Sequence, residues 1–378
     1  MNKRKIVFLT GTRADFGKLK PLINIVEASK DFDCYIFVTG MHTLSKYGAT
    51  FTEIKKLGYK HIFIYMNQTN TTEPDIILSN TVTGFSNFIK EIHPDMIVIH
   101  GDRIEALAGA ITGSFNNILV SHIEGGELSG TLDELIRHAV TKLSHIHFVS
   151  NDEAKKRLIQ MGESESCIFV IGSPDIDIMY GDDLPDIKEV KDHYDISYDN
   201  YATFIFHPIT TELETLAHQI REVVSALIES KKNYVVIYPN NDAGSDIILK
   251  EYERLKNMKN FKILPSVRFE YFLTMLKKSK FLIGNSSAGI KESEVYGIPT
   301  INIGTRQKNR TKSTNIINVD SVRDQILNAI IEVENKKIEK CSYFGDGKSS
   351  QHFFNIVSDP KIWKTPIQKQ FVDLDASN

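Results

Sequence analysis

Short runs of apolar, mostly β-branched residues alternate with longer amphipathic segments along almost the whole chain. The short runs have the length of strands, and the segments between them repeat apolar residues at the spacing of a helix face. In the first half, strands are predicted at 5–10, 33–39, 61–66, 95–100, 117–123, 145–150 and 167–171, and helices at 18–29, 80–92, 105–115 and 152–161. This alternation is typical of βα units on a parallel sheet.

The alternation stops between Pro174 and Asn200, where the chain is polar and acidic and has no long apolar run. Beyond this stretch, strands are predicted at 201–206, 233–238, 261–264, 280–283 and 299–303, and helices at 212–230, 245–257, 269–278, 291–296 and 324–334. The predicted fold class is therefore α/β, with two doubly wound units in series.

A chain of 378 residues exceeds the size at which one hydrophobic core usually stops growing, so we predict two domains. We place the first at residues 1–180 and the second at residues 195–350, with a separate C-terminal segment at 351–378. The residues at 344–350 are predicted to form a loop. Because Trp363 is the single tryptophan and stands near the terminus, we expect the tail to dock on the protein.

Composition and charge narrow the class of protein. Apolar residues make up 41% of the chain and charged residues 25%, and the formal net charge is −3, which indicates a soluble globular protein with no general attraction to nucleic acid. The first apolar run is too short for a signal peptide, and no run reaches the length of a membrane span. Cys34, Cys167 and Cys341 are widely scattered, which favours a reducing cytoplasm over a disulfide framework or a zinc site.

Three carboxylates stand close to the ends of predicted strands in the first half. Asp102 follows the strand at 95–100, Glu124 follows the strand at 117–123, and Asp133 lies on a predicted helix soon afterwards. Because the carboxyl ends of neighbouring parallel strands meet at one edge of a sheet, Asp102 and Glu124 are predicted to face the same ligand. Two carboxylates in that position indicate acid/base chemistry.

Several histidines accompany these carboxylates, which raises the question of a metal site. We interpret His100 and His122 as groups that orient Asp102 and Glu124, and His145 and His147 as structural residues of one strand. No metal is therefore predicted.

The turn at 11–17 joins the first predicted strand to the first predicted helix, a place where backbone N–H groups and the helix dipole favour an anion. The guanidinium of Arg13 suits phosphate oxygens, although an ordinary connecting turn explains the segment equally well. Its glycine spacing matches neither a dinucleotide fingerprint nor a P-loop, so no nicotinamide cofactor is predicted, nor any other.

A second glycine-bearing turn, at 283–289, has a composition that points more directly to a diphosphate. It contains Ser286 and Ser287 and precedes a predicted helix, in which Glu292 is placed to accept hydrogen bonds from ribose hydroxyls. The alternative is that the serines cap the helix and Glu292 complements its dipole.

Three further polar residues follow strands of the second half: His207, Asn241 and Arg306. Each is a weak signal by itself, since histidine after a strand is commonly a structural hydrogen-bonding residue and asparagine suits turns. Their coincidence at the carboxyl edge of the second predicted sheet favours a ligand site between the two domains.

These motifs, in this order, resemble those of the UDP-N-acetylglucosamine 2-epimerases. The resemblance rests on Gly11-Thr-Arg-Ala-Asp-Phe-Gly-Lys-Leu, His100-Gly-Asp-Arg, His122-Ile-Glu-Gly-Gly-Glu, Asp133 with Arg137-His138, His207-Pro208, Asn285-Ser-Ser-Ala-Gly and Gly304-Thr-Arg-Gln, and covers the chain to about Asp320. It implies a GT-B architecture, in which two Rossmann-like domains hold UDP in an interdomain cleft and the segment 351–378 returns to the N-terminal domain. It also suggests a homodimer.

The motifs look closest to the hydrolysing branch, the bacterial sialic acid pathway enzymes that release UDP and N-acetylmannosamine. In that reaction the C2 proton is removed while UDP leaves C1, and water then adds to the resulting 2-acetamidoglucal. The resemblance implies that Asp102, Glu124 and Asp133 do the chemistry, with Arg103 near the phosphates. The residues that it assigns to uridine and diphosphate are Arg13, His207, Asn241, Ser286, Ser287, Glu292 and Arg306.

Three other functions remain open from the sequence. The same reaction on UDP-2,4-diacetamido-2,4,6-trideoxyglucose, in the legionaminic acid pathway, uses the same motifs, and nothing in the sequence identifies the residues that choose between the sugars. A GT-B glycosyltransferase shares the nucleotide contacts but needs an acceptor. A non-catalytic UDP-sugar sensor is disfavoured, because three unneeded carboxylates would repel the diphosphate.

Overall fold

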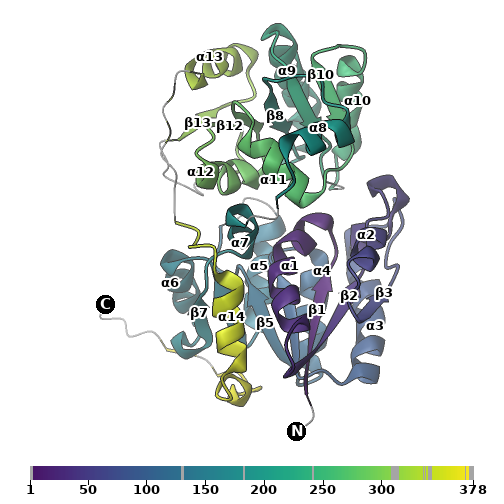
Figure 1. The fold of residues 1–378 in the computed structure, drawn as a ribbon, viewed down its shortest axis with the longest axis vertical. Coiled ribbons are helices and arrows are strands. Elements are labelled where there is room, and N and C mark those ends of the chain that lie inside the picture. Colours follow the sequence, from purple (N-terminus) through teal and green to yellow (C-terminus); the bar gives the residue numbers. More distant parts are fainter. Residues whose placement is uncertain are drawn as a thin grey trace. The chain divides into compact units, whose positions relative to one another are not determined.

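The computed structural model describes residues 3–128, 132–181, 184–240, 242–307, 315–334, 336, 338, 343–370 and 372–373. The chain forms two compact units (Figure 1). The first comprises Met1–Glu127, Asp133–Gly181 and Tyr343–Asn378, and the second comprises Leu128–Leu132 and Asp182–Ser342. The C-terminal helix and the residues after it therefore belong to the first unit, although they follow the second unit in sequence.

The first unit is built on a seven-stranded parallel sheet with strand order β3-β2-β1-β4-β5-β6-β7. The strands are β1 (Arg4–Thr10), β2 (Phe32–Val38), β3 (His61–Ile64), β4 (Met96–His100), β5 (Leu119–Ile123), β6 (Ile146–Val149) and β7 (Ile168–Val170). Along β1, Ile6 and Phe8 join the hydrophobic cluster on one face, whereas Val7 and Leu9 join the cluster on the other. Because successive side chains of a strand point to opposite faces, both faces of this sheet are buried.

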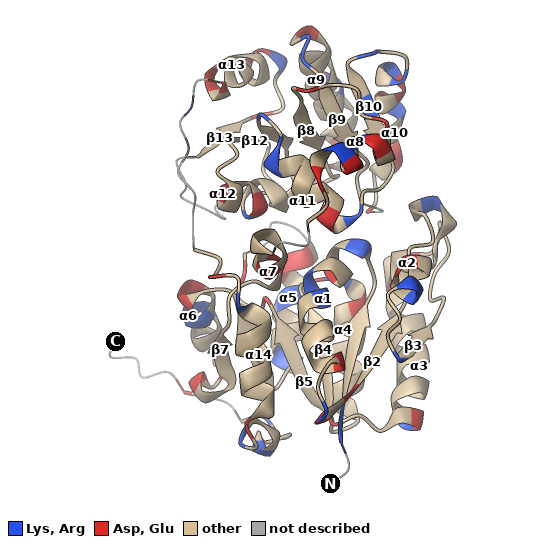
Figure 2. Cartoon of the chain, viewed as in Figure 1, with Lys and Arg blue, Asp and Glu red and all other residues tan. Residues whose placement is uncertain are grey.

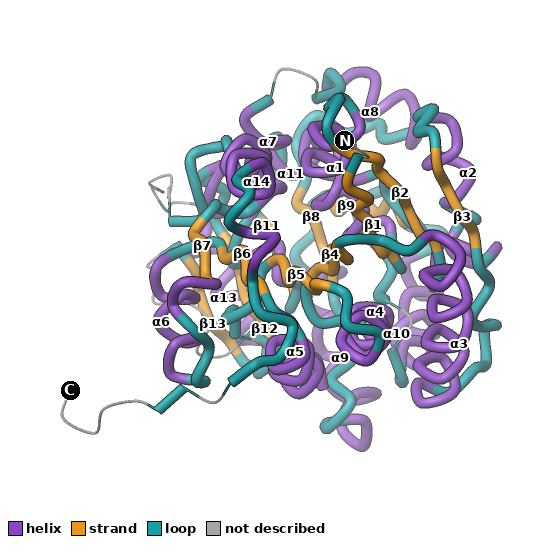
Figure 3. The backbone as a smooth tube through the Cα atoms, turned by 90° about the horizontal axis from the view of Figure 1, so that it is seen from below, coloured by secondary structure: helices purple, strands orange, loops and turns teal. Residues whose placement is uncertain are grey.

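Helices cover both faces of this sheet (Figure 3). They are α1 (Arg13–Glu27), α2 (Phe51–Lys56), α3 (Pro74–Ile92), α4 (Ile104–Phe115), α5 (Leu132–Leu143), α6 (Asp152–Gln160), α7 (Pro174–Tyr180) and α14 (Ser349–Ser358). The α1 and α14 helices pack on the cluster that contains Phe8, and α3, α4 and α5 pack on the cluster that contains Val7. The doubly wound parallel sheet predicted from the sequence is confirmed.

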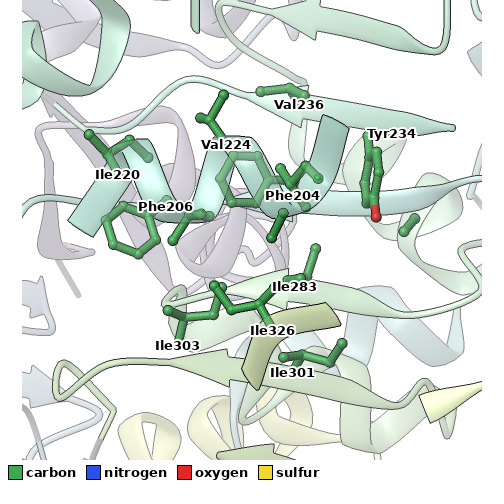
Figure 4. Close-up of a cluster of buried hydrophobic side chains, with 14 of the residues drawn as sticks. Phe204, Phe206, Ile220, Val224, Tyr234, Val236, Ile283, Ile301, Ile303 and Ile326 are labelled. Atoms are coloured by element: carbon green, nitrogen blue, oxygen red, sulfur yellow. The ribbon is translucent and has the colours of Figure 1, made fainter. Parts of the chain in front are cut away.

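The second unit has a six-stranded parallel sheet with strand order β10-β9-β8-β11-β12-β13. Its strands are β8 (Ala202–Ile205), β9 (Tyr234–Ile237), β10 (Phe261–Leu264), β11 (Leu282–Gly284), β12 (Thr300–Ile303) and β13 (Ile316–Val319), and its helices are α8 (Ile187–Tyr194), α9 (Leu213–Glu229), α10 (Ser245–Tyr252), α11 (Phe269–Lys277), α12 (Glu292–Tyr296) and α13 (Arg323–Val333). Phe204 of β8 packs with Ile220 of α9 and Ile326 of α13 in its buried core (Figure 4). None of the described helices in either unit is long and apolar enough to cross a bilayer.

Five of the described helices and strands were not predicted from the sequence, and the first of them is the six-residue helix α2. Between Pro174 and Asn200 the chain forms the short helices α7 and α8, of seven and eight residues. In α8 Val190 alone is buried among the helix residues, so its apolar pattern is too sparse to recognise. The strand β13 was also missed, and α14 begins at Ser349, inside the expected loop at 344–350.

The tail docks on the first unit, as the position of Trp363 predicted. The Arg4 guanidinium lies 4.3 Å from the centroid of the Trp363 ring, and the Phe32 ring lies 6.1 Å from it. The indole Nε1 of Trp363 donates a hydrogen bond of 2.8 Å to the Val357 carbonyl. Phe353 of α14 is completely buried against Phe8 and Phe148. Burial of these aromatic rings makes the tail part of the core.

Lys369 of the tail reaches a buried carboxylate, Glu163, whose side chain is 2% exposed. Glu163 accepts hydrogen bonds from His147 Nε2 at 3.0 Å, from Lys142 Nζ at 2.8 Å and from Lys369 Nζ at 2.5 Å. Lys369 also donates to three backbone carbonyls at the C-terminal end of α5. Burial by itself would raise the pKa of Glu163, but these three donors outweigh it and lower the pKa to about 2.

Glu163→Gln is expected to destabilise the first unit at neutral pH and to weaken its acid sensitivity. The folded-state pKa of Glu163 lies below the ordinary value of 4.5, so its stabilisation is present above about pH 4.5 and is lost as the pH falls towards about 2. The full contribution is on the order of 2–3 kcal/mol. Denaturant unfolding from about pH 7 to about pH 3 measures both the loss in free energy of unfolding and the changed slope of that free energy against pH.

Glu165→Gln is the matched control, because Glu165 pairs with Lys155 at 2.9 Å but is 69% exposed. An exposed pair of this kind contributes less than about 1 kcal/mol. Equal unfolding curves for the two variants across the pH range would contradict the anchoring role of Glu163.

Candidate active site

Asp102 stands on a turn at the carboxyl end of β4 that is fixed by a buried histidine. The turn passes through Gly101, whose φ is +70°, and the Gly101 carbonyl is 2.8 Å from His122 Nε2 in the neighbouring β5. Burial and the nearby His147 lower the pKa of His122 to about 3, so the ring is neutral and Nε2 donates to the carbonyl. His122 therefore orients the turn that carries Asp102, not the carboxylate itself.

Arg137 connects the turns of the two strand-end carboxylates. From α5, its Nη2 donates to Asp102 Oδ2 and its Nη1 donates to the Glu124 backbone carbonyl at 2.6 Å. The guanidinium is almost fully buried. Burial opposes its charge, but the carboxylates of Asp102, Glu127 and Glu124 outweigh this effect and raise the pKa of Arg137. A permanently charged arginine thus brings Asp102 and Glu124 to one place, as the sequence predicted.

Glu124 adopts a left-handed backbone conformation, with φ of +61°, directly after β5. This region costs free energy for a residue with a Cβ, and such residues cluster at functional sites. The carboxylate is held on both oxygens, because Ser173 Oγ donates to Oε1 and His100 Nε2 lies 2.9 Å from Oε2. The prediction that His100 orients a carboxylate is confirmed. The Glu124 side chain is 8% exposed, so its carboxylate is surrounded mainly by these neighbours and little by solvent.

Asp133, the third predicted carboxylate, lies in the first turn of α5 and is half-buried. It precedes Arg137 by four residues, so both side chains stand on the same face of the helix. The structure therefore places Asp133 on the helix that holds Asp102 and Glu124 together. Figure 2 shows acidic and basic residues gathered around the starts of α1 and α5.

The first glycine-bearing turn is organised by Asp15. The Asp15 carboxylate accepts hydrogen bonds of 3.0 Å from the N–H groups of both Gly11 and Thr12, and the Thr12 hydroxyl caps α1 in return. A carboxylate of the same turn therefore already occupies these two N–H groups, as an ordinary connecting turn would have it. The same capping box starts α1 at Arg13, five residues before the predicted start.

The two arginines of the first unit that were predicted to lie near the phosphates are both paired with acidic residues. Arg13 Nη2 donates to Glu53 of α2 at 2.9 Å, and its side chain is 19% exposed. Arg103 stands at the N-cap of α4, with Nε 3.9 Å from the buried Glu105 carboxylate. Phosphate binding by either arginine therefore requires that the guanidinium serve a second anion as well.

In the second unit, His207 and Asn285 join the ends of β8 and β11. The Asn285 side chain accepts from the His207 N–H at 2.7 Å and donates to the His207 carbonyl at 2.8 Å. The Asn240 N–H donates to His207 Nδ1 at 3.1 Å, which places the proton of a neutral ring on Nε2. Asn241, the neighbouring predicted residue, lies outside the described residues.

The turn after β11 approaches the neighbouring strand very closely. Gly284 has φ of +132°, and a Cβ added there would lie 1.8 Å from the Ile205 carbonyl oxygen. Ser286 then accepts a hydrogen bond of 3.3 Å from the Ala288 N–H and caps a short 3₁₀-helix that begins at Ser287. This is the capping role that the sequence left open for Ser286. Glu292 begins α12 and is 4% exposed.

Arg306 and Gln307 close this turn from the loop after β12. Arg306 Nη1 and Gln307 Nε2 both donate to the Asn285 carbonyl, at 3.2 and 2.9 Å. The predicted residues His207, Ser286 and Arg306 are thus grouped around Asn285, which was not predicted as a site residue. Among the described residues, no group of three or more histidine, cysteine or acidic side chains is arranged to hold a metal ion.

Three residues near Glu124 were not predicted as site residues: its neighbours Lys18 and Ser173, and Asp175, which lies beside Lys18. The Lys18 ammonium of α1 is 3.8 Å from Glu124 Oε2 and 3.6 Å from Asp175 Oδ2. Lys18 lies within one of the motifs that carried the family resemblance, so a signal existed. Ser173 and Asp175 belong to a stretch whose pattern gave no sign of an element.

Comparison with known proteins agrees with this description. The family model for UDP-N-acetylglucosamine 2-epimerase matches residues 24–358. The UDP-N-acetylglucosamine 2-epimerase of Neisseria meningitidis serogroup B is 45% identical over 376 residues, which cover 98% of this chain and 100% of the relative. The UDP-N,N'-diacetylbacillosamine 2-epimerase (hydrolyzing) of Legionella pneumophila is 34% identical over 360 residues, which cover 94% and 95%.

The fold of both units also has a solved counterpart. The crystal structure of Methanocaldococcus jannaschii UDP-GlcNAc 2-epimerase in complex with UDP-GlcNAc and UDP is similar, with a TM-score of 0.79. The likeness covers 94% of this chain and 99% of that one, at 23% sequence identity. The predicted fold class, two Rossmann-like domains of the GT-B type, is confirmed.

Proposed function

Because this chain belongs to the UDP-N-acetylglucosamine 2-epimerase family, we propose that it is the hydrolysing enzyme, which converts UDP-N-acetylglucosamine and water into UDP and N-acetylmannosamine. One observation supports this proposal most directly. Arg137 joins the Asp102 carboxylate to the backbone of Glu124 at two neighbouring strand ends, and Glu124 itself has a strained backbone conformation. Two carboxylates at neighbouring strand ends suit a reaction with two proton transfers at one carbon.

In the proposed reaction a carboxylate removes the proton at C2 while the bond between C1 and the UDP oxygen breaks. The electron pair of the C–H bond forms the C1–C2 double bond of 2-acetamidoglucal, and UDP leaves as an anion. Water then adds its hydroxyl at C1, and a proton is delivered to C2 from the opposite face, which gives N-acetylmannosamine. We assign the two proton transfers to Asp102 and Glu124 and give Asp133 the task of orienting one of them or the water.

The nucleotide is proposed to bind to the second unit, around the turn that follows β11. His207, Ser286 and Arg306 are grouped there by Asn285, and the neighbouring predicted residues are Asn241, Ser287 and Glu292. Positive charge from Arg306, and from Arg13 and Arg103 of the first unit, would stabilise the charge that develops on the leaving diphosphate. UDP bound to the relative from M. jannaschii supports a UDP site in this fold. The expected homodimer and the cytoplasmic location stay predictions.

The related substrate UDP-N,N'-diacetylbacillosamine is the second candidate, because the name of the Legionella relative specifies it. The reaction at C1 and C2 is the same for both sugars, and the sugars differ at C4 and C6. The higher identity to the N. meningitidis relative favours UDP-N-acetylglucosamine.

Incubation with UDP-N-acetylglucosamine in D₂O, followed by proton and phosphorus NMR, tests the proposal. We expect free UDP and N-acetylmannosamine with deuterium at C2. UDP-N-acetylmannosamine as the accumulating product would contradict the hydrolysing reaction. If UDP-N-acetylglucosamine is unchanged and UDP-N,N'-diacetylbacillosamine is consumed, the second candidate is the substrate instead.

A further inference from the structure

Lys18 of the first unit stands between two buried carboxylates, and one of them has no part in the proposed chemistry. Its ammonium is 3.8 Å from Glu124 Oε2 and 3.6 Å from Asp175 Oδ2. The Lys18 side chain is 16% exposed, and the Asp175 side chain is completely buried. Both distances exceed that of a charge-assisted hydrogen bond, so the ammonium is shared between the carboxylates and bound tightly to neither.

Asp175 is held in place by elements far apart in sequence. It lies in the first turn of α7, two residues after Ser173, which donates to Glu124. The Ser173 N–H donates to the Phe344 carbonyl at 2.8 Å. Farther along α7, Asp177 accepts hydrogen bonds of 2.7 Å from the N–H groups that begin α14. The docked C-terminal segment therefore contacts α7, the helix that presents Asp175 to Lys18, at two places.

Within the described part of the chain, four elements and two turns bring charged or titratable groups near Glu124. These groups are His100 at the end of β4, Lys18 of α1, Asp175 of α7, and Arg137 of α5 with Asp102 and Glu127 of the turns after β4 and β5. Positive Lys18 favours the ionised form of Glu124, whereas a negative Asp175 disfavours it. In a dry site, these opposed effects are large because little water screens them.

We infer that Asp175 is a positioning residue that holds the Lys18 ammonium against Glu124 and, through its own charge, sets the pH at which Glu124 gives up its proton. The inference rests on the proposed function, in which Glu124 exchanges a proton with the sugar. A base must be ionised at working pH and yet hold a proton well enough to remove one from carbon. Lys18 keeps Glu124 ionised at working pH, and Asp175 raises the affinity of Glu124 for the proton.

The pH dependence of kcat tests this pair, because the two members shift it in opposite directions. Asp175→Asn keeps the shape of the side chain and removes its charge, so the acid limb of the profile is expected to move to lower pH by about one unit. The weaker base is expected to lower the maximal kcat about five-fold, with little change in KM. Lys18→Gln is expected to move the acid limb to higher pH.

Asp177→Asn is the matched control from the same helix. Asp177 caps α14, so its replacement is expected to lower the thermal stability and to leave the acid limb of kcat where the wild type has it. An acid limb in Asp175→Asn that coincides with that of the wild type, or that moves equally in Asp177→Asn, would show that Asp175 is a structural residue and overturn the inference.

A second measurement does not depend on turnover. The difference in thermal stability between wild type and Glu124→Gln, measured as a function of pH, reports the titration of Glu124. The same difference is then measured between two proteins that both carry Asp175→Asn. We expect the pH midpoint of the Glu124 titration to fall when Asp175 loses its charge. Wild-type protein that consumes no UDP-sugar would refute the proposed function, while an unchanged midpoint would refute the role of Asp175.

Discussion

Glu124→Gln is expected to lower kcat roughly 1,000-fold, within the range found for the loss of a general acid or base. Glutamine has the shape of glutamate and can still accept the hydrogen bond from Ser173, so the turn after β5 should keep its conformation. What it loses is the capacity to exchange a proton with C2 of the sugar. Steady-state kinetics and the rate of deuterium incorporation at C2 should therefore fall together, while KM changes much less.

Glu127→Gln is a suitable control, because Glu127 follows Glu124 by three residues on the same turn. Its carboxylate accepts a hydrogen bond from Ser150 and contributes to the charge around Arg137, but it is not assigned a proton transfer. Near-normal turnover is expected for this variant. Retention of more than about a tenth of the wild-type kcat in Glu124→Gln would contradict the assignment of Glu124 to the chemistry.

The fold could be predicted well from the sequence because both sheets are buried on both faces. Continuous apolar runs such as the one around Val7 are typical of such strands, and they are separated by helices with clear apolar faces. The failures came where local capping or a short element decided the structure. The α1 helix starts at Arg13 because Thr12 and Asp15 cap it, although the polar residues of that turn suggested a loop. The α8 helix has too few buried positions to show a period.

The candidate site, like the fold, was predicted only in part from the sequence. The position of Asp102 and Glu124 followed from the rule for parallel sheets, since each carboxylate comes directly after a strand. The contacts that tune Glu124 did not follow, because Ser173 stands 49 residues further along the chain and Lys18 belongs to the first helix. Such contacts depend on how α1 and α7 pack against the sheet. A sequence without those packing distances contains no local signal for them.

Gly284→Ala is expected to destabilise the second unit by more than about 4 kcal/mol, a loss that single substitutions rarely cause. The added Cβ would lie 1.8 Å from the Ile205 carbonyl oxygen and 2.7 Å from the Ile205 carbonyl carbon. Both atoms belong to the backbone of β8, which is paired with β11 and cannot move without loss of that pairing. The φ of +132° at Gly284 adds a further strain for any residue with a Cβ.

Because the chain has two units, hydrogen exchange measured peptide by peptide is more informative than one unfolding midpoint. Faster exchange in Gly284→Ala is expected in β8 and β11 and in the turn that carries Asn285, while β4 and β5 of the first unit keep their protection. Gly304→Ala is the control within the second unit, since Gly304 has φ of +76° but a Cβ there would meet nothing closer than 3.8 Å. Gly304→Ala should therefore lose only the free energy that the backbone conformation costs a residue with a Cβ, about 1 kcal/mol.

Equal exchange in the two variants would mean that the close approach of β11 to β8 relaxes at little cost in free energy. In that case the requirement for glycine at Gly284 would be conformational, and the turn that groups His207 and Arg306 would depend less on this strand contact than its geometry indicates.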